Sequence, residues 1–173
     1  MSLRVGRPVA APGLDTPHIM LLQADHRMNF FTGSRWPAPT PDVVEALAAE
    51  TLRASGAWAS IEYSSSPFPS EYLLQLTVRR FEADYTEGGS APVVYVVFDC
   101  ALGRREGRDV ITTFTVSGTT PATANRLAEV VSAFEQATGA ALNSLSQRAT
   151  QAVLGDMERS TQNEANPAPS SSR

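Results

Sequence analysis

The chain has 173 residues, of which 42% are apolar, so it is long enough to bury one hydrophobic core. Its 14 basic residues are all arginine and are outnumbered by 18 acidic residues, giving a net charge of −4 that argues against binding to nucleic acid. The longest apolar run, 92–98, is far short of the roughly 20 residues that a membrane-spanning helix needs.

The N-terminal part is predicted to begin with strands. Three apolar segments have strand-like patterns: 3–10, which Pro8 interrupts, 18–23 and 27–32. The short polar break at Asp25 and His26 separates the last two segments. This spacing predicts a β-hairpin.

The first helix is predicted over 41–55. Thr40 is a suitable N-cap, Pro41 suits the first helical position, and the carboxylate of Asp42 favours the positive end of the helix dipole. Apolar residues recur at helical spacing through the segment, and Gly56 can adopt the left-handed conformation that ends a helix. The helix therefore has one apolar face to bury.

The middle of the chain is predicted to be a sheet. A strand at 57–63 is followed by a polar loop at 64–70. Three longer strand-like segments come next: 73–81 with its continuation to Tyr85, 93–102 and 110–116. Short polar turns join these three segments, which is typical of an antiparallel meander.

A second helix is predicted over 122–157, bent at Gly139, because Thr120 and Pro121 repeat the first helix's start signal and apolar residues keep helical spacing. Residues 158–173 contain no large apolar side chain and are predicted to be a disordered tail. Residues 1–157 then form a single domain. The expected fold is an α/β (α+β) sandwich, with a mixed, largely antiparallel sheet and two helices on one of its faces.

The single cysteine, Cys100, excludes an intramolecular disulfide and an all-cysteine metal site. Its β-branched and aromatic neighbours favour a buried strand position. The alternative is a redox-sensitive or catalytic thiol, which would need a nearby base. The two histidines, His18 and His26, lie far away in the sequence.

No other motif indicates an enzyme. Asp25, His26 and Arg27 fit a solvated turn better than an acid–base site, because adjacent residues point in different directions. Two histidines eight residues apart are too few for a metal site, and the serines at 64–66 have no base beside them. We expect no catalytic residue, cofactor or metal.

Adjacent arginines, Arg79 and Arg80, should point to opposite faces of their strand. We expect a structural ion pair with Glu62, Glu82 or Asp99, which is favoured over an anion-binding site.

Two aromatic residues are candidate contacts for a partner. Phe68 lies between two prolines in a polar loop, so it is either a plug in the core or an exposed anchor. Trp36 precedes the first helix and is expected to pack over its start, with a role in a ligand pocket as the alternative.

The chain also resembles the ABC-type transport auxiliary lipoprotein family, the small outer-membrane subunits of MCE-type (mammalian cell entry) lipid transport systems. The residues that carry the resemblance are Pro12-Gly13-Leu14-Asp15-Thr16-Pro17 with Ile19, Arg35-Trp36 with Pro37 and Pro39, and Leu52-Arg53-Ala54-Ser55-Gly56. A later pattern of strands and a terminal helix adds Phe81, Phe114 and Leu142. The similarity spans roughly residues 3–155.

The resemblance implies a fold similar to the N-terminal domain of TolB and a periplasmic location, tethered to the outer membrane by an N-terminal lipidated cysteine. It implies three partners, namely an MCE-domain protein, an ABC permease and an ATPase, together with lipid as a further ligand. The first residues show neither a signal peptide nor a lipobox cysteine, which taken alone would favour a cytoplasmic protein. Cys100 is internal and cannot serve as the anchor.

These observations lead to three functional hypotheses. The first is a non-enzymatic accessory subunit that docks to the MCE component of a lipid transport system. The second is a stand-alone periplasmic module that binds a small apolar ligand between the sheet and the helices. The third is a hydrolase that uses Cys100 or a histidine, which a buried cysteine and separated histidines would remove.

Overall fold

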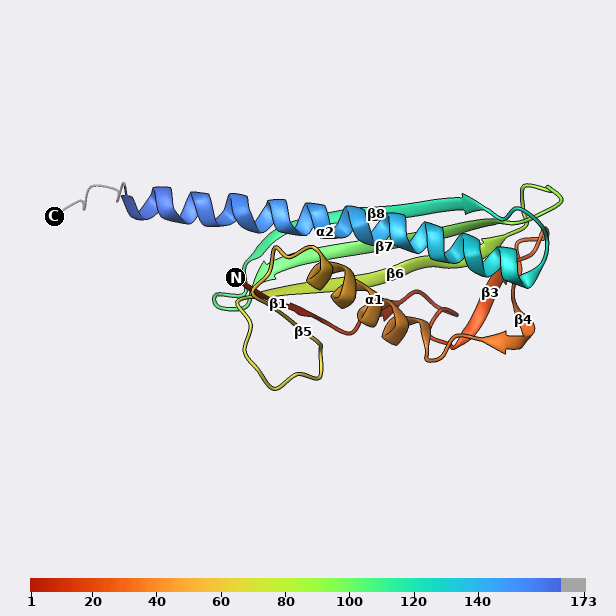
Figure 1. Cartoon of the computed structure of the whole chain (residues 1–173), viewed down its shortest axis with the longest axis horizontal. Coiled ribbons are helices and arrows are strands. Elements are labelled where there is room, and N and C mark those ends of the chain that lie inside the picture. The colour runs from red at the N-terminus through yellow and green to blue at the C-terminus, as the bar shows by residue number, and fades with distance from the viewer. Residues whose placement is uncertain (166–173) are drawn as a thin grey trace.

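A computed structural model describes residues 1–165 (Figure 1). Its strands are β1 Ser2–Val5, β2 Val9–Ala10, β3 His18–Leu22, β4 Met28–Arg35, β5 Ser60–Glu62, β6 Tyr72–Asp84, β7 Val93–Arg104 and β8 Val110–Pro121. Its helices are α1 Thr40–Ala54 and α2 Leu127–Ala165.

The 13-residue strand β6 is the central strand of the sheet and pairs with four other strands, β1, β2, β3 and β7. One of its edges pairs with β7 in antiparallel orientation over its whole length. Its other edge pairs in turn with β1, β2 and β3, all parallel to it. Pro8 interrupts this N-terminal segment, and Gly6 and Ala11 donate main-chain hydrogen bonds to the carbonyls of Leu74 and Val78 on either side of the break.

The remaining strands extend the sheet outward. Strand β8 pairs with β7, and β4 pairs with β3, both in antiparallel orientation. Strand β5 lies beyond β1 and parallel to it. The predicted hairpin, the meander and the mixed, largely antiparallel sheet are therefore confirmed, since the long pairings are antiparallel and the short ones parallel.

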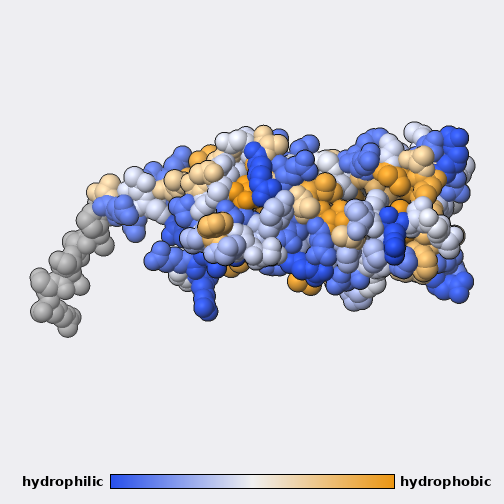
Figure 2. Space-filling view, turned by 60° about the horizontal axis from the view of Figure 1, so that its bottom comes forward, coloured by the Kyte–Doolittle hydropathy of each residue, from blue (hydrophilic) through white to orange (hydrophobic). Residues whose placement is uncertain are grey.

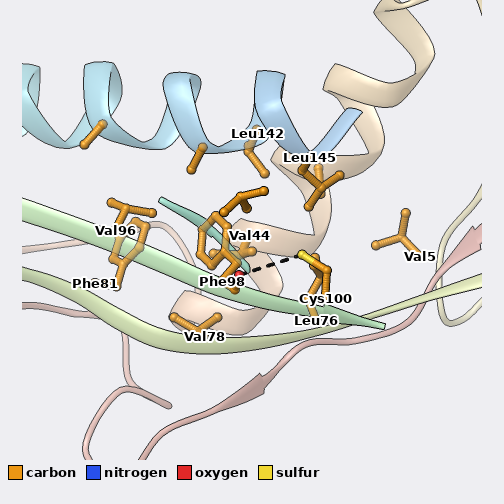
Figure 3. Close-up of a cluster of buried hydrophobic side chains, with 14 of the residues drawn as sticks. Val5, Val44, Leu76, Val78, Phe81, Val96, Phe98, Cys100, Leu142 and Leu145 are labelled. Carbon is orange, nitrogen blue, oxygen red and sulfur yellow. Dashed lines mark hydrogen bonds between the residues drawn. The ribbon is translucent and has the colours of Figure 1, made fainter. Parts of the chain in front are cut away.

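Both described helices lie on one face of the sheet, as predicted. Figure 3 shows Val44 of α1 and Leu142 of α2 over Phe98, in the core beneath both helices. Along β7 every second side chain is buried on this side: Val94, Val96, Phe98, Cys100 and Leu102. This alternation is what a sheet with one covered face requires.

The starts of both helices differ from the prediction. Thr40 is the first residue of α1 and not its cap, and its hydroxyl donates a hydrogen bond to the carbonyl of Thr16 at 3.1 Å. Thr120 and Pro121 do not start a helix: they continue β8 and pair with β7, so α2 begins only at Leu127. Local residues signal a helix start there, but pairing with a neighbouring strand prevails.

The predicted tail is wrong over residues 158–165, where α2 continues as a helix to Ala165, and it also runs through Gly139 without a break. Glu158 and Arg159 are good helix formers, and the first proline after them is Pro167. The rest of the predicted tail, residues 166–173, lies outside the described residues. That residues 1–157 form one domain stays a prediction.

Candidate functional site

Cys100 lies in the core, paired across the sheet with Leu76 and Phe114. Burial, with a smaller contribution from the carboxylate of Asp99, raises the pKa of the Cys100 thiol to about 12, although Arg148 acts in the opposite direction. The prediction of a buried cysteine on a strand is confirmed. A thiol that is protonated at neutral pH and closed to solvent is a poor nucleophile, so the hydrolase hypothesis loses its main support.

The histidines do not form a site. The ring of His18 stacks on Phe30 with 4.2 Å between ring centroids. His26 occupies a tight turn with a φ of 65°, beside an ion pair of 2.6 Å between Asp25 and Arg27, so the predicted turn is confirmed. Within residues 1–165, no group of three or more His, Cys, Asp or Glu residues is placed to hold a metal ion.

The adjacent arginines serve structural ion pairs, as predicted. The prediction that they point to opposite faces is wrong, because a register shift between Val78 and Arg80 marks a bulge in β6, and the two arginines reach Asp99 and Tyr95 on the same face of β7. Arg79 lies 3.4 Å from the carboxylate of Asp99, and Arg80 lies 2.6 Å from Glu82. A further pair of 2.9 Å between Arg80 and Asp84 was not predicted, because it depends on how β6 continues past its bulge.

Trp36 lines an apolar groove between α1 and α2. Its ring meets the rings of Phe81 and Phe134 edge-on, with centroids 5.9 and 5.2 Å apart. The groove has a volume of about 250 Å³, and its walls include Val43, Leu47 and Leu142. Trp36 therefore packs into the core and also lines a groove, whereas the sequence favoured packing over the helix start.

The indole nitrogen of Trp36 is buried and has no hydrogen-bond partner within the described residues. A buried N–H donor without a partner costs about 1–3 kcal/mol.

Phe68 lies in the loop between β5 and β6 and is 66% exposed. The loop is held at this point, because the Phe68 carbonyl accepts a hydrogen bond from the guanidinium of Arg4 and its N–H donates to the hydroxyl of Ser66 at 3.3 Å. The side chain points to solvent from an anchored backbone, which excludes the core-plug alternative. A contact with a partner stays a prediction.

The sequence missed two features of the surface. Leu47, on the rim of the groove, belongs to the apolar stripe of α1 but is 37% exposed, because the spacing of the two helices leaves it open. Val110, after a charged turn, is 67% exposed. Figure 2 shows that hydrophobic residues on the displayed face form separate patches divided by hydrophilic ones. No helix in residues 1–165 is long and apolar enough to cross a membrane.

Comparison with known proteins found solved structures that are similar to this one. The structure is similar to protein XCC0632 from Xanthomonas campestris, with 27% identity, a TM-score of 0.84 and coverage of 91% of this chain and 87% of that one. An uncharacterized protein matches with 15% identity, a TM-score of 0.67 and coverage of 88% and 91%. The PelC dodecamer from Paraburkholderia phytofirmans matches with 16% identity, a TM-score of 0.50 and coverage of 83% of each chain. At 15% and 16% identity, the last two matches show only that the fold is similar.

A search of curated proteins found no match. The model of one family matches residues 1–151, which is most of the chain. That family is described as the ABC-type transport auxiliary lipoprotein component. The chain belongs to this family of auxiliary lipoproteins of ABC-type transport.

Proposed function

We propose that this protein is a non-enzymatic docking subunit of an MCE-type lipid transport system in the periplasm, tethered to the outer membrane by a lipid anchor. Its partners are the MCE-domain protein and, through it, the permease and ATPase. The observation that carries the proposal is the apolar groove between α1 and α2, which Trp36 helps to line.

The groove suits an inserted side chain of a partner. Tryptophan is among the residues enriched at binding hot spots, where it lies in a pocket that excludes water. Here the Trp36 ring is fixed by Phe81 and Phe134, so little conformational entropy is lost on docking.

A second candidate function uses the same groove: a stand-alone module that binds a small apolar ligand. The apolar walls formed by Val43, Leu47 and Leu142 favour it. Against it, the groove is open, and its volume of about 250 Å³ lies below the roughly 300–1,000 Å³ typical of small-molecule pockets. Docking of a partner side chain is therefore the better fit.

The test is co-purification of the full-length native protein with its envelope partners. The Leu47→Arg variant places a charge on the rim of the groove, at a site already 37% exposed, so the core is undisturbed. Its matched control is Leu154→Arg, because Leu154 is 47% exposed on α2 outside the groove. We expect Leu47→Arg to reduce capture of the MCE component at least tenfold and the control to leave it unchanged.

Two other outcomes decide against the proposal. If Leu47→Arg and Leu154→Arg capture the MCE component equally well, the groove is not the docking site. Loss of binding of an apolar fluorescent fatty acid in Leu47→Arg, with capture retained, would favour the ligand-binding module.

A further inference from the structure

A second cleft lies on the sheet face opposite the helices, where β7 turns into β8. It has a volume of about 430 Å³. Its apolar floor comes from Leu73 of β6, Ala101 of β7 and Val110 of β8. Arg105 and Arg108, both exposed in the turn between the two strands, stand at its rim.

Within residues 1–165, the charges of these two arginines are not neutralised by ion pairs. Neither forms an ion pair within residues 1–165, whereas Arg104 next to them is paired with Asp156 at 2.8 Å. Arg105 makes one long hydrogen bond, of 3.4 Å, from its guanidinium to the hydroxyl of Ser70. Asp109 is the one acidic residue that lines the cleft within the described part of the chain, against the two arginines Arg105 and Arg108, and Glu106 of the same turn lies outside the lining.

The turn that carries the arginines is held in place. The main-chain N–H of Arg105 donates to the carbonyl of Glu71 at 2.9 Å, and that of Arg104 donates to the carbonyl of Asp109 at 2.9 Å. Arg108 adopts a φ of 57°, which directs the chain back into β8. Two guanidinium groups are thus presented from a fixed turn beside an apolar floor.

The exposure of Val110 is a second observation, independent of the arginines, that favours a ligand in this cleft. It is 67% exposed, the largest exposed fraction among the large hydrophobic side chains of the described residues. A valine at the start of a strand can face solvent without consequence, but this one borders a cleft whose floor is also apolar. An amphiphile would cover Val110 and Leu73 with its apolar part while its anionic group lies between the arginines.

We propose that this cleft binds the phosphate head of a phospholipid, with Arg105 and Arg108 on the phosphate and Val110, Leu73 and Ala101 against the first part of an acyl chain. Guanidinium groups bind phosphate oxygens through strong charge-assisted hydrogen bonds. The inference rests on the proposed role in lipid transport and adds to it a lipid site on the accessory subunit, separate from the groove at Trp36.

The experiment titrates the full chain with a short-chain, soluble phosphatidic acid below its micelle concentration, followed by NMR shifts of arginine side chains and of the Val110 methyl groups. We expect saturable binding that weakens at least tenfold in the Arg105→Gln/Arg108→Gln double variant and in Val110→Asp. The matched control is Arg126→Gln, because Arg126 is an exposed arginine before α2 that does not line the cleft.

Two further probes identify the ligand chemistry. Inorganic phosphate should bind much more weakly than the lipid, and a short-chain diacylglycerol without phosphate should not saturate the site. Equal binding of inorganic phosphate would overturn the lipid assignment, and equal binding of the neutral lipid would overturn the role of the arginines. Leu47→Arg should leave lipid binding unchanged, because Leu47 does not line this cleft. The lipid titration therefore tests this site separately from the docking experiment.

Discussion

Gly118 of β8 lies so close to Ala137 of α2 that a Cβ atom at Gly118 would be 1.8 Å from the Ala137 carbonyl oxygen. Real Cβ atoms do not approach other atoms to less than about 3.0 Å. The absence of a side chain at this one position therefore lets the backbone of α2 lie directly against β8, as Figure 1 shows for the two elements.

The first prediction follows from this contact. Gly118→Ala should lower the free energy of unfolding by about 1–3 kcal/mol, because the obstructing atoms are backbone and cannot rotate away. Urea denaturation measures the change. Gly139→Ala is the matched control: nothing lies within 4 Å of the position that its new methyl group would take, and alanine in a helix interior should add about 0.5–1 kcal/mol. A Gly118→Ala variant as stable as the wild type would show that α2 can shift away from β8.

Most of the fold could be predicted because its signals are local. The strands are marked by β-branched and aromatic runs, and α1 has a single apolar stripe. The one-sided burial of β7 does not follow from its sequence, which is apolar on both faces apart from Asp99. The errors occur where the deciding contact is distant in sequence. Thr120 and Pro121 imitate the start of α1, but pairing with β7 keeps them in a strand. The role of Gly118 was invisible because its partner, Ala137, lies in another element.

The candidate site was predictable only in part. The sequence left Phe68 as either a core plug or an exposed anchor, and only the structure shows that it is exposed. The burial of Cys100 was predicted from its β-branched and aromatic neighbours. A pocket at Trp36 was only the alternative interpretation, because the presence of a groove there depends on the separation of two helices. The cleft beside Arg105 depends in the same way on where the turn after β7 folds.

The second prediction concerns Phe68. Phe68→Ala should change the free energy of unfolding by no more than about 0.5 kcal/mol, because the side chain is 66% exposed. If Phe68 is a partner contact, the same variant should weaken capture of the MCE component by about 1–3 kcal/mol. Thermal melts and a capture assay on one preparation separate the two effects.

The control for Phe68 is Phe98→Ala. Phe98 is fully buried under both helices, so its loss should cost about 3–5 kcal/mol of stability. Unchanged melting together with unchanged capture in Phe68→Ala would leave that residue without a role.

The third prediction concerns the pH dependence of stability. Burial raises the Cys100 pKa to about 12 from an ordinary value of 9.0, so the folded state holds the thiol proton more tightly than the unfolded state. The resulting stabilisation is fully present below pH 9 and is lost as the pH rises from about 9 to about 12. Urea denaturation of the wild type and of Cys100→Ala over this range measures the free energy of unfolding of each. The difference between the two free energies should become smaller as the pH rises.

A thiol reagent provides a second readout for Cys100. In the native state at neutral pH it should react only as fast as the protein opens, and in urea it should react at the rate of a free cysteine. Rapid modification of the native protein would contradict the burial of this side chain.

The last prediction concerns the end of α2. Arg104 of β7 binds the carboxylate of Asp156 at 2.8 Å and donates a second hydrogen bond to the hydroxyl of Ser160, so it fastens the final turns of the helix to the sheet. Arg104→Gln should release them. Hydrogen exchange of the amides in 157–165 should become faster, while exchange in 130–150, which packs on β7 and β8, should keep its rate.

The cost in global stability should be small, because Arg104 is partly exposed and water screens its ion pair. Arg126→Gln is the control: it removes an exposed ion pair with Glu129 near the other end of α2 and should leave exchange in 157–165 unchanged. Asp156→Asn should reproduce the effect of Arg104→Gln, since it removes the other partner of the same contact. If neither variant accelerates exchange in 157–165, the helix beyond Asp156 is held by its own propensity, and the attachment to β7 contributes nothing to it.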